Sequence, residues 1–256
     1  MFELEDILSI PSYSGREERL VDKIESFCLD KKLSYYKDHK NNLYVTKGNS
    51  EYFPCVVAHT DTVHDDQENL INLNERLEIV NHSFDGLTFL SALNKGEKTG
   101  VGGDDKCGVW ICLSILDRID NIKCAFFAQE EIGMKGSREC DVDFFRNIGY
   151  ALQFDAPTDN WFSKSCSGFN LWTENYFQKV VPLLEDYGVN KISRDPFTDV
   201  VQLRKKFDFC CSVLPTGYYE QHTKNEYVVK EHTLKCLNLG IDFLNLLGNE
   251  KYIFDE

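Results

Sequence analysis

The sequence predicts an α/β fold in which a mixed, mostly parallel central sheet carries helices on both faces. Short apolar runs that do not alternate with polar residues are typical of strands buried on both faces. The chain has four such runs, at 55–58, 124–128, 150–154 and 207–214. Three stretches with helical apolar spacing lie between or after them, at 109–119, 174–187 and 234–247. Because strands alternate with helices, a layered α/β arrangement is favoured over a bundle or a sandwich.

Other local patterns complete this picture. Residues 16–29 place apolar side chains on one helical face, and Ser14 with Glu17 three positions later predicts a capping box before that helix. Pro182 falls inside the 174–187 helix, so we expect a kink or a break there. A further short strand is expected at 169–172.

Composition excludes several classes of function. The net charge of −14 argues against nucleic acid and against an anionic membrane surface, since both attract basic patches. No apolar run approaches the roughly 18 residues of a membrane span, and the start of the chain lacks the pattern of a signal peptide. We therefore expect a cytoplasmic protein made of one catalytic domain, residues 1–256, without an interdomain linker.

The ten cysteines do not indicate a metal or disulfide framework. Most lie inside apolar runs, where a free cysteine packs as a small hydrophobic residue, and the chain contains no CxxC pair. A thiolate zinc site is therefore not expected.

Histidine and carboxylate residues follow the predicted strands. His59 and Asp61 follow the first run, Asp104 and Asp105 follow the glycine-rich stretch 99–103, Glu130 and Glu131 follow the second run, Asp155 follows the third, and His222 comes after the fourth. In open α/β sheets, ligands bind outside the carboxyl ends of the strands. These side chains are thus expected at one rim, where imidazole and carboxylate ligands suit zinc, with manganese or cobalt as alternatives.

Each residue also has a simpler interpretation when taken alone. A histidine before a polar loop is usually a surface or hydrogen-bonded residue, and paired acidic residues often mark a solvated turn or the start of a helix. The stretch around Asp155 could be a simple turn. The glycine-rich stretch could be a flexible loop or a phosphate loop without its GK[ST] ending. The metal-site hypothesis depends on their joint placement.

Five ordered motifs resemble those of the co-catalytic di-zinc exopeptidases, the superfamily of peptidase T, the aminoacylases and the zinc aminopeptidases. The motifs are HTDTVH (59–64), GGDDKCG (102–108), QEEIGMKGS (129–137), QFDAP (153–157) and HTKNEYV (222–228). Two further segments, LSIPSYSGREE (8–18) and TDVVQLR (198–204), are similar as well. The resemblance covers nearly the whole chain, and HTDTVH is nearest to the peptidase T branch.

The resemblance implies a role for each residue. His59 and Asp155 would be terminal ligands of one metal, Glu131 and His222 terminal ligands of the other, and Asp104 the bridging ligand. Asp61 would be the carboxylate that orients His59, and Glu130 the general base. A cis peptide after Asp104 is also implied. Tyr218 or Tyr219 could stabilise an oxyanion, with loop packing as the alternative.

These roles predict the reaction. Two divalent ions, with zinc expected and Co²⁺ or Mn²⁺ as alternatives, would lower the pKa of a bound water, and Glu130 would move its proton to the leaving amine. The predicted function is a metal-dependent aminopeptidase or di/tripeptidase acting on small peptides. Two alternatives stay open: an amidase or deacylase on N-acyl amino acids, and a non-catalytic metal-binding relative.

One departure from the family affects the substrate. The peptidase T and aminoacylase branches insert a lid or dimerisation domain between the fourth and fifth motifs, whereas here the interval from Asp155 to His222 is filled by predicted strands and helices. We therefore expect no lid. Because the lid supplies substrate-binding groups and the dimer contact, the terminal specificity and the oligomeric state stay open.

Overall fold

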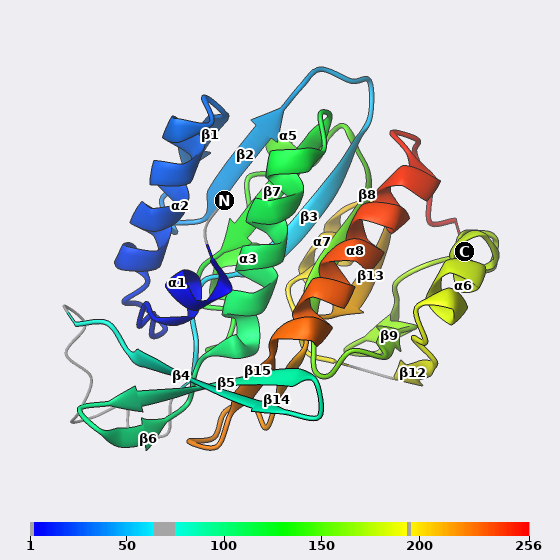
Figure 1. The fold of residues 1–256 in the computed structure, drawn as a ribbon. Coiled ribbons are helices and arrows are strands. Elements are labelled where there is room, and N and C mark those ends of the chain that lie inside the picture. The colour runs from blue at the N-terminus through cyan, green and yellow to red at the C-terminus, as the bar shows by residue number, and fades with distance from the viewer. Residues whose placement is uncertain (1–2, 64–74, 194–195, 256) are drawn as a thin grey trace.

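A six-stranded sheet forms the centre of the computed structural model, which describes residues 3–63, 75–193 and 196–255 (Figure 1). Its strand order is β1-β2-β7-β3-β8-β13. The strands span Ser34–Lys37 (β1), Leu43–Lys47 (β2), Phe53–His59 (β3), Ile122–Phe127 (β7), Ile148–Ala156 (β8) and Cys210–Pro215 (β13). The β7, β3, β8 and β13 strands are parallel, while β1 and β2 are antiparallel. The predicted mixed, mostly parallel sheet is therefore confirmed.

Helices cover both faces of this sheet, which explains why its central strands lack polar positions. Every residue of β3, β7 and β13 is buried. The helices are Leu4–Leu8 (α1), Glu18–Asp30 (α2), Gly103–Arg118 (α3), Lys135–Arg138 (α4), Val142–Phe145 (α5), Glu174–Asp186 (α6), Val200–Lys206 (α7) and Lys230–Leu247 (α8). Figure 1 shows α3 and α8 in front of the sheet and α7 behind it. A sheet covered in this way buries apolar side chains on both of its faces.

A second, smaller sheet lies beneath the start of α3 (Figure 1). It has the order β14-β15-β5-β4, and β6 pairs with β5. Its strands span Glu78–Phe84 (β4), Leu87–Asn94 (β5), Glu97–Thr99 (β6), Tyr218–Tyr219 (β14) and Tyr227–Val229 (β15). Short pairs are also formed by Trp161–Ser163 (β9) with Lys191–Ser193 (β12), and by Ser165–Cys166 (β10) with Phe169–Asn170 (β11). The chain passes from β6 through residues 100–102 into α3, and from β15 directly into α8.

The predicted capping box is wrong. The N-cap of α2 is Glu17, and no side chain caps the helix. Ser14 instead donates its hydroxyl to Asp61, and the Glu17 carboxylate accepts the backbone N–H groups of Gly15 and Gln129. Both side chains thus have partners beyond the helix, which local sequence spacing does not reveal.

Two other local expectations need correction. The α6 helix runs from Glu174 to Asp186 without a break, although Pro182 lies inside it. Pro182 is exposed, so water can reach the carbonyl group whose helical partner it removes. The strand expected at 169–172 is shorter, because only Phe169–Asn170 pairs as β11.

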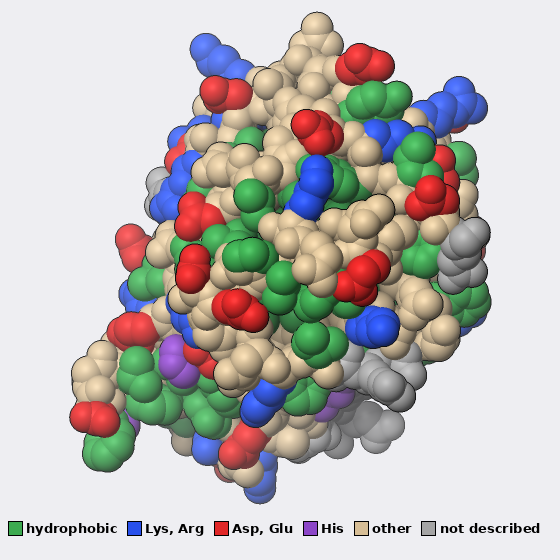
Figure 2. Space-filling model, turned by 90° about the vertical axis from the view of Figure 1, so that its right-hand side faces the viewer, with side chains coloured by type: hydrophobic (Ala, Val, Ile, Leu, Met, Phe, Trp, Pro, Cys, Tyr) green, Lys and Arg blue, Asp and Glu red, His purple; other side chains and the backbone are tan. Residues whose placement is uncertain are grey.

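The remaining composition arguments can be compared with the structure. All ten cysteines are free and buried. None of the helices in the described ranges combines the length and the apolar character needed to cross a bilayer. On the face that Figure 2 shows, acidic and basic side chains are interspersed, so the basic patch typical of nucleic-acid binding is not seen there.

Two helix glycines that face Phe154 provide a test of the packing. A Cβ atom at Gly108 in α3 would lie 2.2 Å from the Phe154 carbonyl oxygen, whereas one at Gly240 in α8 would lie 2.6 Å from the tip of the Phe154 ring. The ring can shift and the backbone cannot. We expect Gly108→Ala to lower the free energy of unfolding by about 3 kcal/mol and Gly240→Ala by about 1 kcal/mol. Urea unfolding measures both, and equal losses would contradict this account of the α3 contact.

Candidate metal centre

The carboxyl ends of three adjacent parallel strands bring the predicted site residues together. His59 is the last residue of β3, Asp155 lies near the end of β8, and Glu130 and Glu131 form the turn after β7. The order β7-β3-β8 makes these strands neighbours. Asp104 reaches the same edge from the first turn of α3. This edge is where the strand-end argument placed the site.

Asp104 lies between the two histidines. Its Oδ1 is 3.1 Å from His59 Nε2, and its Oδ2 is 3.3 Å from His222 Nε2. Asp155 Oδ1 lies 3.5 Å from His59 Nε2, and Glu131 Oε1 lies 2.9 Å from His222 Nε2. All five predicted ligands therefore gather in one cluster, with one oxygen of Asp104 directed at each half.

The donor set fits two cations. His59, Asp104 and Asp155 form one group, and Asp104, Glu131 and His222 form another that shares Asp104. A third group consists of His59, Glu130 and Glu131; within each group the candidate ligand atoms lie within 4.8 Å of one another. Imidazole nitrogens and carboxylate oxygens are ligands of zinc, and a shared carboxylate suits a pair of ions about 3.5–4 Å apart. In addition, Glu130 Oε1 is buried without a hydrogen-bond partner. A buried acceptor of this kind indicates that a further group belongs beside it.

Burial makes Asp155, Glu131 and Glu130 hard to ionise, whereas at Asp104 the hydrogen bonds from His222 and His59 outweigh burial and lower the pKa. Loss of solvent raises the pKa of Asp155 and of Glu131, and it raises the pKa of Glu130 to about 11. The neighbouring carboxylates add to the effect, since like charges disfavour ionisation. Cations held between these groups would offset both the cost of burying the carboxylates and the repulsion between them.

The same negative charges favour the charged form of the two imidazoles and raise their pKa values. Burial by itself lowers the pKa of His59, but Asp155 and Asp104 together hold that pKa well above its usual value. Hydrogen bonds to Asp104 and Glu131 raise the pKa of His222 to about 10. The cluster thus attracts positive charge, which is the electrostatic condition for a cation site.

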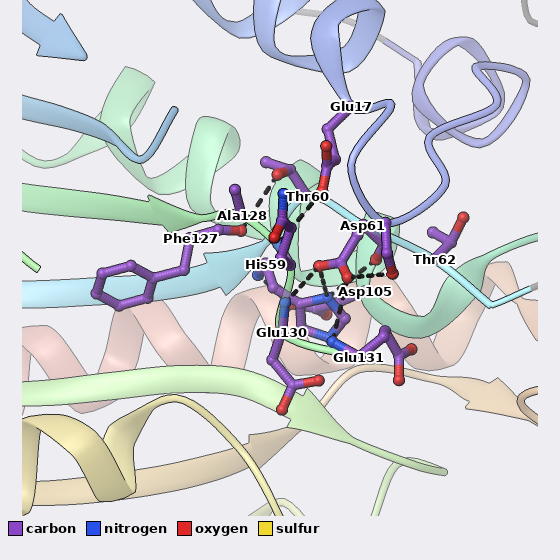
Figure 3. Close-up of polar contacts among 12 residues, drawn as sticks. Glu17, His59, Thr60, Asp61, Thr62, Asp105, Phe127, Ala128, Glu130 and Glu131 are labelled. Atoms are coloured by element: carbon purple, nitrogen blue, oxygen red, sulfur yellow. Dashed lines mark hydrogen bonds and ion pairs between the residues drawn. The ribbon is translucent and has the colours of Figure 1, made fainter. Parts of the chain in front are cut away.

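Asp61 positions the turn that carries the two glutamates. Its Oδ1 accepts the Glu130 N–H at 2.8 Å and its Oδ2 accepts the Glu131 N–H at 3.1 Å. Ser14 donates its hydroxyl to the same Oδ2 at 2.7 Å. With the backbone fixed, the Glu130 and Glu131 side chains point in different directions (Figure 3). Adjacent residues can therefore serve different purposes.

The contact between Asp61 and His59 differs in one atom from the expected one. His59 Nδ1 lies 2.9 Å from the Asp61 main-chain carbonyl oxygen, compared with 3.5 Å from its carboxylate Oδ1. Asp61 still faces the ring nitrogen that is directed away from Asp104. However, the carboxylate itself is used mainly by the Glu130–Glu131 turn.

The neighbourhood of Asp104 contains two further features. The Asp104–Asp105 peptide is cis, as the resemblance implied. The Asp105 side chain turns away from the cluster, where it accepts the His59 N–H and the Gly108 N–H, both at 3.1 Å. Asp105 thereby joins the start of α3 to the end of β3.

Several polar residues around the ligands were not predicted. Thr198 donates its hydroxyl to Asp155 Oδ2, and Gln153 Nε2 donates to the same oxygen at 3.2 Å. Asp199 is buried next to them and accepts the Ser137 hydroxyl. Glu226 accepts two N–H groups from the turn that presents Asp104. Thr198 and Asp199 lie in TDVVQLR, and Glu226 lies in HTKNEYV. The motifs therefore included these residues, but the sequence did not reveal which groups they contact.

The two tyrosines considered for an oxyanion role have other partners. The Tyr218 hydroxyl donates to the Asp155 carbonyl oxygen at 3.3 Å, and the Tyr219 hydroxyl lies 2.6 Å from His232 Nδ1. Tyr219 also stacks on Tyr227. Tyr219 therefore fits loop packing, while Tyr218 contacts Asp155 and lies next to the cluster.

Replacement of Asp61 tests how the glutamate turn is held. Asp61→Asn keeps one acceptor oxygen, so one backbone N–H of Glu130 or Glu131 loses its partner in a buried setting. We expect a loss of about 1–3 kcal/mol in the free energy of unfolding. Ser14→Ala is the matched control, because it removes one donor and leaves both backbone contacts, and it should cost less than about 1 kcal/mol. Equal urea midpoints for the two variants would contradict the assignment.

Comparison with solved structures identifies the fold. No protein-family model and no curated relative matches the sequence. The aminopeptidase PepT from Bacillus cereus is similar over 95% of this chain and 96% of its own, with a TM-score of 0.75 and 13% identity. A tripeptidase from Staphylococcus aureus gives 0.72 at 14% identity over 95% and 96%. The TET1 peptidase of Pyrococcus horikoshii gives 0.70 at 16% identity over 93% and 97%. The chain therefore has the fold of these peptidases, which is the fold that its motifs implied.

Proposed function

We propose that this chain is a metal-dependent peptidase that hydrolyses an amide bond in small peptides, as an aminopeptidase or a di/tripeptidase. The observation that carries the proposal is the pair of ligand groups that share Asp104, with the buried Glu130 beside them. The peptidase fold supports it, since the similar structures include an aminopeptidase and a tripeptidase.

In this proposal the five clustered residues hold two divalent cations, with zinc as the expected metal. His59 and Asp155 would hold one cation, Glu131 and His222 would hold the other, and Asp104 would serve both. Cations bound there supply a lowered pKa for a water molecule and polarisation of the substrate carbonyl. The roles of the ligands are supported by the distances between their donor atoms.

Glu130 then acts as the proton carrier. Its Oε1 has no hydrogen-bond partner among the described residues, so it is available to a water molecule on one side and to the leaving nitrogen on the other. The backbone contact with Asp61 holds Glu130 apart from Glu131. Proton transfer and metal binding are thereby assigned to different carboxylates of the same turn.

The remaining parts of the proposal concern the setting of the reaction. We take residues 1–256 as a single catalytic domain without a lid, because the interval between Asp155 and His222 consists of short strands together with α6 and α7. A cytoplasmic location is supported by ten free cysteines, since free thiols are typical of reducing compartments.

A substrate panel tests the reaction class. The protein is freed of metal with a chelator and then assayed with Zn²⁺, Co²⁺ or Mn²⁺ on dipeptides, tripeptides, peptides blocked at the amino terminus, and N-acyl amino acids. We expect metal-dependent release of amino acids from the unblocked peptides. Cleavage of only the N-acyl amino acids would favour the deacylase, and hydrolysis that persists in chelator would refute the metal site.

Replacement of Glu130 separates catalysis from metal binding. Glu130→Gln keeps the size of the side chain but cannot accept the proton, so we expect kcat to fall by at least about 10²-fold. Because Glu130 is not one of the five proposed ligands, the metal content should stay at two ions per chain. Glu139→Gln, at an exposed glutamate, is the control and should keep full activity. Full activity in the Glu130 variant would refute its role.

A further inference from the structure

Two segments far apart in the sequence deliver the ligands of the second cation. Asp104 lies in the turn that begins α3, and His222 lies in the loop between β14 and β15. Neither segment is a strand of the central sheet. Their relative position therefore needs a constraint other than the pairing that fixes His59 and Asp155 on neighbouring strands.

Glu226 joins these two segments. It is only 1% exposed, its Oε2 accepts the Gly102 N–H at 2.6 Å, and its Oε1 accepts the Asp104 N–H at 3.1 Å. Its own N–H donates to the Thr223 carbonyl oxygen at 3.1 Å, which closes the turn directly after His222. One buried carboxylate thus holds the main chain of Asp104 and belongs to the short turn that directly follows His222.

The opposite side of the glycine turn is also fixed. A Cβ atom at Gly102 would lie 2.6 Å from Lys106 Cε and 2.9 Å from a methyl group of Thr62, and one at Gly103 would lie 2.7 Å from Tyr218 Cβ. Lys106 is itself buried, and its Nζ donates to the carbonyl oxygens of Leu8 and Ile10 at 2.6 and 3.1 Å. The turn therefore lies between an anchored lysine and Glu226, with no room to shift.

We propose that Glu226 is a positioning residue that sets the distance between Asp104 and His222, and with it the affinity of the second cation. The first cation depends on Glu226 less, because Glu226 holds only one of its three proposed ligands, Asp104, whereas His59 and Asp155 lie on two paired strands. This inference rests on the proposed two-metal function. Partners that orient metal ligands without touching the metal typically change affinity by about 10–100-fold.

The test is a titration of the metal-free full chain with Co²⁺, in which calorimetry and visible absorption measure the binding of each ion. Glu226→Gln offers only one acceptor oxygen. Either the Gly102 N–H or the Asp104 N–H would therefore face the amide NH₂ group and lose its acceptor. We expect the second binding constant to fall about 10–100-fold and the first to change by less than about threefold. Glu226→Asp keeps both acceptor oxygens on a shorter side chain and should give an intermediate loss, and it serves if the glutamine variant does not fold.

Glu231→Gln is the matched control. Glu231 Oε2 accepts the Thr88 N–H at 2.7 Å, so it is also a carboxylate bound to a distant main chain, but it joins α8 to β5. This variant should keep both binding constants. Equal weakening of both cations by the Glu226 variants, or no weakening, would overturn the inference. A wild-type chain that binds fewer than two ions would instead refute the proposed function, so the two failures can be told apart.

Discussion

The bidentate position of Asp104 between two imidazoles is the contact on which the rest of the site depends. One carboxylate oxygen faces His59 and the other faces His222, and this shared residue joins two groups of side chains that could each hold a metal ion. Burying three ligand carboxylates together with Glu130 is unfavourable without matching positive charge. The pKa shifts of Asp155, Glu131 and Glu130 reflect that cost. Positive charge held between these groups would offset that cost.

The central sheet makes this concentration of charge possible. Its parallel strands end at one edge, and the polar residues lie at that edge, outside the apolar interior. His59 and Asp155 come from strands that are hydrogen-bonded to each other. The small sheet formed by β4, β5, β6, β14 and β15 brings the His222 loop to the same place. The large sheet thus provides rigid positions for His59 and Asp155, while the small sheet brings His222 to the same cluster.

Around the ligands, carboxylates repeatedly hold backbone N–H groups. Asp61 binds the Glu130–Glu131 turn, Glu17 binds Gln129, and Glu226 binds the turn before Asp104. A carboxylate that accepts N–H groups fixes the main chain and so directs the side chains attached to it. The acidic character of the site therefore serves two purposes, because some carboxylates are proposed to bind cations and others orient the turns that carry them.

The sequence alone was sufficient for the fold class, because unbroken apolar runs and helical spacing are local properties of buried strands and amphipathic helices. It also indicated the five clustered residues, because His59, Glu131 and Asp155 come at the ends of parallel strands, which end together, and the ordered motifs include Asp104 and His222 as well. Local spacing failed where a side chain has a distant partner: Ser14 and Glu17 form no capping box since Asp61 and Gln129 bind them. Only the tertiary structure decided that the Asp61 carboxylate holds the glutamate turn, that Glu226 joins the Asp104 and His222 segments, and that Tyr219 pairs with His232. These contacts join residues far apart in the chain, and their geometry arises only when the two sheets and their connecting turns pack against each other.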